Sequence, residues 1–171
     1  MSLFPLVRFD PICVGQANEG LLAWGHKMGP LNRPFQSLEL AHGLFHGDEL
    51  VGVVTTSTLV RPNIGGGLGH IDRENARELS RLCASRSGLN RVVLRLWREF
   101  VFPGLGVPLV ISYQDSDLHT GNTYRFDGWE KVGFCRAGGD DPRSGRKARN
   151  RNVWAWPPSV SAALAAAEKG A

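Results

Sequence analysis

The chain has 171 residues, of which 42% are hydrophobic and 21% are charged, and its formal net charge is +4. These are the values of a globular protein long enough to bury a core, so the composition excludes a wholly disordered chain. No stretch approaches the roughly 18 apolar residues of a membrane span, and the first residues do not resemble a signal peptide. The three widely spaced cysteines Cys13, Cys83 and Cys135 predict buried thiols in a cytoplasmic protein rather than a disulfide framework.

The first half of the chain predicts an edge strand, a weak helix and a β-hairpin. The strand covers residues 3–9, with Pro5 near its start, and the helix covers residues 15–28, where three glycines lower its propensity. Residues 37–46 and 49–58 are predicted strands joined by a short turn. The glycine-rich stretch 61–70 predicts a flexible loop rather than a phosphate cradle, because no helix follows it.

The second half begins with a strand at residues 77–84. The strongest predicted helix follows, N-capped by Ser85 or Ser87, with its apolar residues at helical spacing up to Val101. Next come a strand at 107–113, a short helix at 121–127, strands at 129–137 and 152–156, and an alanine-rich helix or frayed tail at 159–171. This order predicts an α+β (mixed α/β) fold, a single domain over residues 1–158 with a mostly antiparallel sheet flanked by helices.

The positive charge is concentrated in one stretch, residues 136–152, which we call the basic segment. It contains six basic and two acidic residues, whereas the rest of the chain has 14 of each. Such a segment favours nucleic acid, because each neutralised phosphate releases counterions; the alternative is a solvated hairpin loop. The residues predicted to contact DNA are Arg143, Arg146, Lys147, Arg149 and Arg151.

Several motifs carry a resemblance to a known family. They are ELSRLC at 78–83, ISYQD at 111–115, HTG at 119–121 and YRFDGW at 124–129, with WGHKMG at 24–29 as a weaker member. With the order of elements, they resemble the Mom family of phage DNA-modification proteins, a divergent branch of the GCN5-related N-acetyltransferase (GNAT) superfamily. The resemblance covers residues 20–135 and implies a GNAT-like fold.

The resemblance also implies a cofactor site at the start of the long helix. GNAT proteins hold the pyrophosphate of acetyl-CoA on backbone N–H groups there, where the helix dipole favours an anion. The corresponding residues are Arg86, Ser87 and Gly88, with Arg81 on the preceding strand. The stretch SRSGLNR at 85–91 departs from the usual Gly-x-Gly pattern, so a capped helix with surface arginines remains the alternative.

Candidate catalytic residues gather after the strand at 107–113. Asp115 lies where catalytic side chains emerge from an open sheet, and His119 is a candidate base near neutral pH. For Tyr124 the resemblance implies a proton donor to the departing thiolate. The further candidates are Ser112, Tyr113 and His26.

Each of these assignments has an alternative. Asp115 and His119 also suit a turn, and Tyr124 and Trp129 suit core anchors. Five of the candidates would together offer oxygen and nitrogen ligands for a metal such as iron, but the metal is left unassigned. They are His26, Tyr113, Asp115, His119 and Tyr124.

The resemblance implies a transferase that modifies bases in double-stranded DNA and protects that DNA from restriction, working in the host cytoplasm. It would transfer an acyl-derived group to an exocyclic or appended amine, and Trp154 and Trp156 would help to hold an extruded base. One alternative is an acetyl-CoA-dependent N-acetyltransferase acting on an aminated thymine. Another is a non-catalytic DNA-binding protein. The chain is expected to be a monomer or a homodimer.

Overall fold

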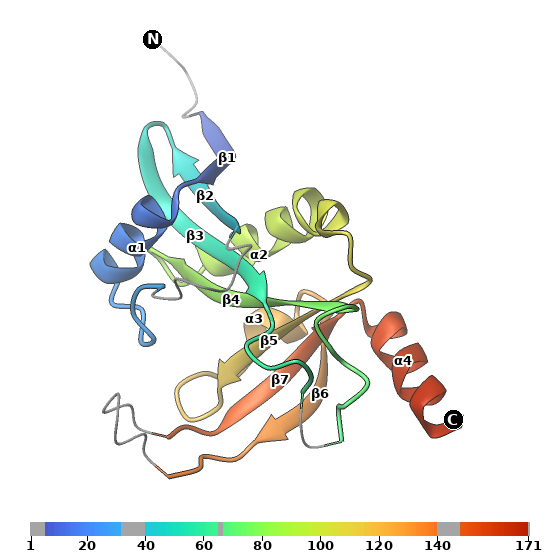
Figure 1. Cartoon of the computed structure of the whole chain (residues 1–171). Helices are drawn as coiled ribbons and strands as arrows, with labels where there is room; N and C mark the ends of the chain where they lie inside the picture. Colours follow the sequence, from blue (N-terminus) through green and yellow to red (C-terminus); the bar gives the residue numbers. More distant parts are fainter. Residues whose placement is uncertain (1–5, 32–39, 65–66, 140–147, 171) are drawn as a thin grey trace. The chain divides into compact units, whose positions relative to one another are not determined.

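The computed structural model describes residues 6–31, 40–64, 67–139 and 148–170 (Figure 1). The chain forms two compact units, Met1–Val60 with Glu78–Gly106, and Arg61–Arg77 with Val107–Ala171. Each unit is therefore built from two segments that are distant in sequence. Within the described residues, no helix is both long and apolar enough to cross a membrane.

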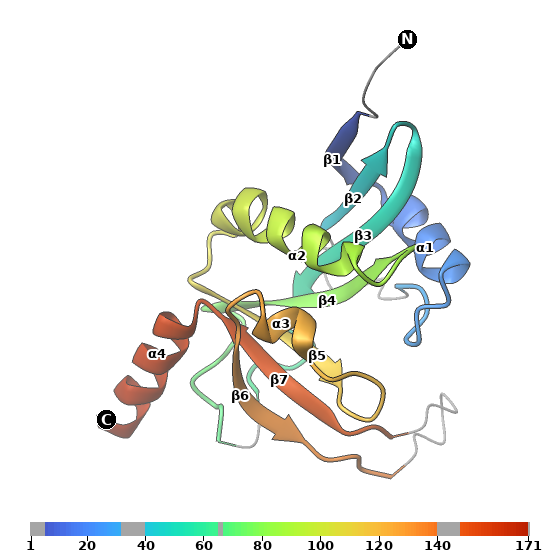
Figure 2. The same ribbon diagram turned by 180° about the vertical axis from the view of Figure 1, so that it is seen from behind.

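The first unit is a sheet with a helix on each face. Its elements are β1 (Val7–Ile12), α1 (Val14–Ala23), β2 (Leu40–His46), β3 (Glu49–Thr58), β4 (Ala76–Ala84), α2 (Leu89–Phe100) and a 3-10 turn (Phe102–Leu105). The strands lie in the order β1-β2-β3-β4, and the pairs β1–β2 and β2–β3 are antiparallel. Figures 1 and 2 show α1 and α2 on opposite faces of β2 and β3.

Helix α2 packs on the sheet through a narrower stripe than its apolar spacing predicts. Val93, Leu94 and Trp97 are buried, and the Trp97 indole Nε1 donates to Thr56 Oγ1 on β3 at 2.8 Å. Val92 and Phe100, which the helical pattern assigned to the core face, are exposed instead. At 100° per residue, Val92 lies about 120° from the centre of a stripe on Val93 and Trp97, so it is turned out of the interface. Phe100 lies close to that stripe in angle, but it is the last residue of the helix.

Three sequence predictions in this unit need correction. The N-cap of α2 is Gly88, without a side-chain capping bond, rather than Ser85 or Ser87. The predicted helix 15–28 ends at Ala23, because the chain turns through Gly25 and Gly29, both with positive φ. Cys13 is exposed, and its Sγ accepts the Gln16 N–H as the N-cap of α1.

In its described residues, the second unit contains three antiparallel strands and two helices. They are β5 (Leu109–Asp115), α3 (Asn122–Arg125), β6 (Glu130–Cys135), β7 (Arg151–Trp156) and α4 (Pro158–Gly170). The order is β5-β7-β6, so the last strand of the chain lies between the other two. Figure 2 shows α3 over one face of these strands, which we call the α3 side.

The glycine-rich stretch behaves as a loop, as predicted, within its described residues. Asn63 forms an isolated bridge with Asp72, and the Ile64 N–H donates to the Ile71 carbonyl at 3.0 Å. Two predicted strand limits shift, because β5 begins at Leu109 and continues to Asp115. The alanine-rich end of the chain is helical from Pro158, so the alternative of a frayed tail is wrong for residues 158–170.

Candidate functional site

The residues of the ISYQD motif project from the two faces of β5 in alternation. Ser112 and Gln114 point to the α3 side, because their side chains bond with Tyr124 on α3 and with Trp154. Tyr113 and Asp115 therefore project from the opposite face. The predicted catalytic residues of this strand thus divide into two groups.

Ser112 and Tyr124 form a buried hydrogen-bonded pair on the α3 side. Their hydroxyl oxygens are 2.8 Å apart, and the exposed fractions are 1% for Ser112 and 8% for Tyr124. The Tyr124 ring stacks on Trp154, with centroids 5.7 Å apart, and meets Trp129 edge-on at 5.2 Å. Burial raises the pKa of Tyr124 to about 12, although the bond with Ser112 lowers it. The tyrosine therefore stays protonated at neutral pH.

Gln114 connects this pair to the loop that follows β5. Its Oε1 accepts the Asn152 amide at 2.9 Å and the Trp154 indole N–H at 3.2 Å. Its Nε2 donates to the carbonyls of Asp115 and His119. The sequence analysis gave Gln114 no role. Its alternation with Ser112 on an otherwise apolar strand was the available sign of a buried polar position.

Asp115 shapes the same loop and carries an arginine partner. Its Oδ1 accepts the N–H groups of Asp117 at 3.0 Å and Leu118 at 3.2 Å, which is the turn geometry that the alternative assignment described. Its Oδ2 lies 3.5 Å from Arg149 Nη1. Asp115 is also opposite Arg151 in the β5–β7 register, and the Arg151 guanidinium lies 5.5 Å from the Tyr113 ring centroid.

Both candidate histidines lie in turns. His119 is exposed, and its N–H donates to the Asp115 carbonyl at 3.1 Å. His26 follows α1 in the first unit, and its Nδ1 accepts the Met28 N–H at 3.3 Å. Among the residues that the structure describes, no group of three or more His, Cys, Asp or Glu side chains is arranged to hold a metal ion. In the second unit, the candidate oxygen ligands Tyr113 and Asp115 lie on the other face of β5 from Tyr124.

The turn from β4 to α2 is open, polar and positively charged. Arg86, Ser87 and Gly88 are all exposed, no side chain caps the helix, and its first turn contains no acidic residue. An anion at this position would find a helix N-terminus and an arginine without a competing carboxylate. The exposed charge of this turn suits the pyrophosphate of a CoA thioester, whereas the Leu89 and Asn90 N–H groups already donate to the carbonyls of Arg86 and Ser87.

Arg81 is placed differently from its prediction. It does not end its strand, because β4 continues to Ala84, and its side chain is buried. Its Nε donates to the Gly29 carbonyl at 3.2 Å and its Nη1 to the Ser80 carbonyl at 2.8 Å. The bond to Gly29 links β4 to the turn that contains His26. A contact from Arg81 to the cofactor stays a prediction.

A buried polar cluster in the first unit was missed by the sequence analysis. Thr55 and Ser80 join β3 to β4 through hydroxyl oxygens 3.1 Å apart, and both are buried. Glu78, two residues before Ser80 and so on the same face of β4, is only 6% exposed. As a buried carboxylate, Glu78 is a candidate general base. The ELSRLC motif contained it, but its strand pattern alone did not separate Glu78 from a surface position.

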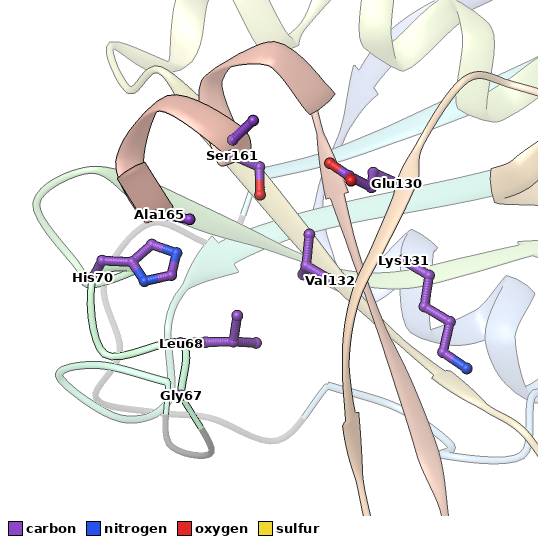
Figure 3. Close-up of a pocket in the computed structure, with 9 residues that line it drawn as sticks. Gly67, Leu68, His70, Glu130, Lys131, Val132, Ser161 and Ala165 are labelled. Carbon is purple, nitrogen blue, oxygen red and sulfur yellow. The ribbon is translucent and has the colours of Figure 1, made fainter. Parts of the chain in front are cut away.

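Two cavities formed by described residues, one in each unit, include no predicted site residue in their walls. A cavity of about 320 Å³ in the first unit lies between the end of α2 and β1–β2, with His42 in its wall. Figure 3 shows the other, about 300 Å³, beside α4. Its lining residues are Gly67, Leu68, His70, Glu130, Lys131, Val132, Ser161, Ala162 and Ala165.

Of the basic segment, the described residues are 136–139 and 148–152. The predicted DNA contacts Arg143, Arg146 and Lys147 lie outside them, whereas Arg149 and Arg151 lie inside. These two arginines contact Asp115 and Tyr113, as described above. The end of the basic segment thus adjoins the end of β5, although 33 residues or more separate them in sequence.

No protein-family model and no curated protein sequence matches the chain. Solved structures do match its fold. A probable acetyltransferase (GNAT family) from Chromobacterium violaceum is 16% identical with a TM-score of 0.60, and the match covers 87% of this chain and 86% of that one. The ribosomal-protein-S18-alanine N-acetyltransferase of Escherichia coli is 11% identical with a TM-score of 0.58, covering 88% and 92%.

A third solved structure, Arabidopsis thaliana Naa50 in complex with the bisubstrate analogue CoA-Ac-MVNAL, is 10% identical with a TM-score of 0.56. The match covers 87% of this chain and 97% of that one. These likenesses extend over nearly the whole of each chain and confirm the predicted mixed α/β, mostly antiparallel architecture. The chain therefore has the fold of the GNAT N-acetyltransferases.

Proposed function

We propose that this protein is an acyl-CoA-dependent N-acyltransferase whose acceptor is an amine on a DNA base. The observation that carries the proposal is the turn from β4 to α2, together with the fold. The start of α2 has no capping side chain and no acidic residue, and Arg86 and Ser87 are exposed beside it. This is the arrangement that binds phosphate groups at a helix N-terminus. When bound, acyl-CoA would supply an activated thioester.

Two residues of the second unit are assigned to the proton transfer and to the acceptor amine. As the acceptor nitrogen bonds to the acyl carbon and the carbon–sulfur bond breaks, the leaving sulfur requires a proton. Tyr124 is assigned as its donor, because burial keeps the hydroxyl protonated and the bond to Ser112 fixes its direction. Asp115 is assigned to hold the acceptor amine at the end of β5, on the opposite face of the strand from Tyr124, and its Oδ2 lies 3.5 Å from Arg149 Nη1.

The DNA acceptor is supported by the position of Arg149 and Arg151. The β5–β7 register places Arg151 opposite Asp115, so cations that suit phosphate groups adjoin the carboxylate assigned to the base amine. Phosphate contacts fix the register of a nucleic acid on a protein, and specific groups then read or modify the base. The Mom resemblance points to the same acceptor.

Calorimetric titration with acetyl-CoA tests the donor. We expect saturable binding that Arg86→Glu abolishes. Arg61→Glu is the matched control, because it reverses an exposed charge in the second unit and should leave the affinity unchanged. Equal affinity in Arg86→Glu and the wild type would refute this cofactor site.

Mass spectrometry of nucleosides tests the acceptor. DNA from cells that express the wild type should contain a new acylated nucleoside. Asp115→Asn should abolish it, because this variant keeps the Oδ1 acceptor for the loop N–H groups but removes the charge. A product found only on DNA that carries an aminated thymine would favour the alternative acetyltransferase. Acylation of peptides or polyamines with unmodified DNA would refute the DNA acceptor.

A further inference from the structure

The second unit exposes two phenylalanine rings on the α3 side. Phe126, directly after α3, is 57% exposed, and Phe134 on β6 is 50% exposed. Phe134 belongs to this face because it pairs with Asn152, whose side-chain amide donates to Gln114 Oε1. Paired residues of antiparallel strands project to the same side. Phe134 therefore shares a face with the Ser112–Tyr124 pair, and Phe126 follows α3, the helix that lies over that face.

A cationic side chain lies beside each ring. Lys131 Nζ lies 5.7 Å from the centroid of Phe134, and the Arg125 guanidinium carbon lies 5.0 Å from that of Phe126. Lys131 pairs with Trp154 and so projects to the α3 side. Figure 3 agrees, because the Lys131 side chain leaves β6 away from Leu68, His70 and Ser161. An aromatic ring with an adjacent cation offers a stacking surface for a base and a partner for its phosphate.

The register places Phe134 next to the end of β5. Gln114, Asn152 and Phe134 form one row across β5, β7 and β6, and Asp115, Arg151 and Cys135 form the next row. A base on Phe134 would lie on the same face as Gln114, one residue before the end of β5, whereas the side chains of Asp115 and Arg151 project from the opposite face.

We propose that the α3 side of the second unit binds single-stranded DNA. Unpaired bases stack on Phe134 and Phe126, and phosphates pair with Lys131 and Arg125. The partner is single-stranded because the faces of bases inside a duplex are already stacked and are not available to side chains. This inference rests on the proposed function and refines its acceptor from duplex DNA to an unpaired nucleotide.

Fluorescence anisotropy provides the test. The probes are an oligothymidine of about 20 nucleotides and a duplex of equal length, at about 0.1 M salt. We expect the single strand to bind more tightly. Phe134→Ala should weaken its binding about tenfold, and Phe134→Tyr should retain most of it, because the tyrosine keeps an aromatic face. The control is Phe100→Ala, which removes an exposed ring, 73% accessible, from the first unit.

The outcomes separate this inference from the proposed function. If DNA binds but Phe134→Ala matches Phe100→Ala, or if the duplex binds as tightly as the single strand, the stacking surface is refuted and the DNA acceptor stands. If acetyl-CoA binds and neither form of DNA does, the DNA acceptor itself is refuted. Tighter binding of oligouridine than of oligothymidine would also overturn the inference, because the surface would then serve RNA. Unchanged thermal unfolding of both alanine variants would show that lost binding is not lost folding.

Discussion

The Ser112–Tyr124 pair makes the sharpest prediction, because one substitution there separates an anchoring role from a catalytic one. Tyr124→Phe removes only the hydroxyl. The ring can keep its stacking with Trp154 and its edge contact with Trp129, so little packing is lost. What changes is that Ser112 Oγ, in a residue only 1% exposed, loses the bond at 2.8 Å.

The magnitude follows from this burial. A neutral hydrogen bond contributes about 1 kcal/mol, and leaving a buried hydroxyl without a partner costs about 1–3 kcal/mol. We expect Tyr124→Phe to lower the free energy of unfolding by about 2 kcal/mol. Ser112→Ala should have a similar effect, since it strands the tyrosine hydroxyl. The double variant should lose less than the sum, because it removes both polar groups together.

Urea unfolding of the wild type, the two single variants and the double variant measures the coupling between the two hydroxyls. In parallel, release of the CoA thiol in the presence of DNA measures the rate of transfer, at a temperature where every variant is folded. If Tyr124 donates the proton, Tyr124→Phe should lower kcat about 100-fold or more. Ser112→Ala should lower it less, because the acid remains.

Two results would refute this reasoning. Additive losses of stability in the double variant would mean that the two hydroxyls are not coupled. An unchanged kcat in Tyr124→Phe, with the loss of stability observed, would reduce Tyr124 to a core anchor and overturn its role as proton donor.

Further predictions concern the alkaline and acid limits of stability and two turns. Because the folded pKa of Tyr124 is about 12 against 10 unfolded, stability should fall as pH rises from 10 to 12, by about 2–3 kcal/mol, and Tyr124→Phe should lose this part of the decline. Burial lowers the pKa of His42, so stability should fall as pH drops below about 6.5, and His42→Leu should fall less steeply in acid unfolding. Gly121→Ala should lower the free energy of unfolding by about 2 kcal/mol or more, because φ is +77° and the added Cβ would lie 2.5 Å from Trp154 Cζ2. Gly128→Ala is the control, because its φ is +85° but no atom lies within 4 Å of the added Cβ. It should cost only about 1 kcal/mol in the same urea assay. Gln114→Leu should cost about 3 kcal/mol and speed amide exchange in the loop after β5, and unchanged exchange there would contradict the role given to Gln114.

The sequence predicted the elements best where local pattern and tertiary packing agree. Strand β3 is predicted residue for residue as Glu49–Thr58, because its β-branched run matches a buried strand. The helix at 15–28 was too long, because propensity does not locate the turn at Gly25. The capping residue of α2 was wrong for a related reason. Two serines suited the cap equally well, and the backbone path placed Gly88 there instead.

The candidate site divides in the same way. The candidate catalytic side chains could be recognised in the sequence, because Asp115 follows an apolar strand and Tyr124 begins the next motif. Their partners were not. Arg149 contacts Asp115 from the far end of the basic segment, and Gln114 joins Asn152, Trp154 and the loop after β5 through bonds that span up to 40 residues.

The sequence by itself determined the order of strands and helices, the concentration of charge in residues 136–152, and the residue types at the end of β5. These depend on local periodicity and composition, which one chain displays directly. Only the tertiary structure decided that β7 lies between β5 and β6, and with it that Arg151 is opposite Asp115 and Phe134 is in a row with Gln114. The physical reason is that strand pairing and register are settled by contacts between residues far apart in the chain, and these set which side chains share a face.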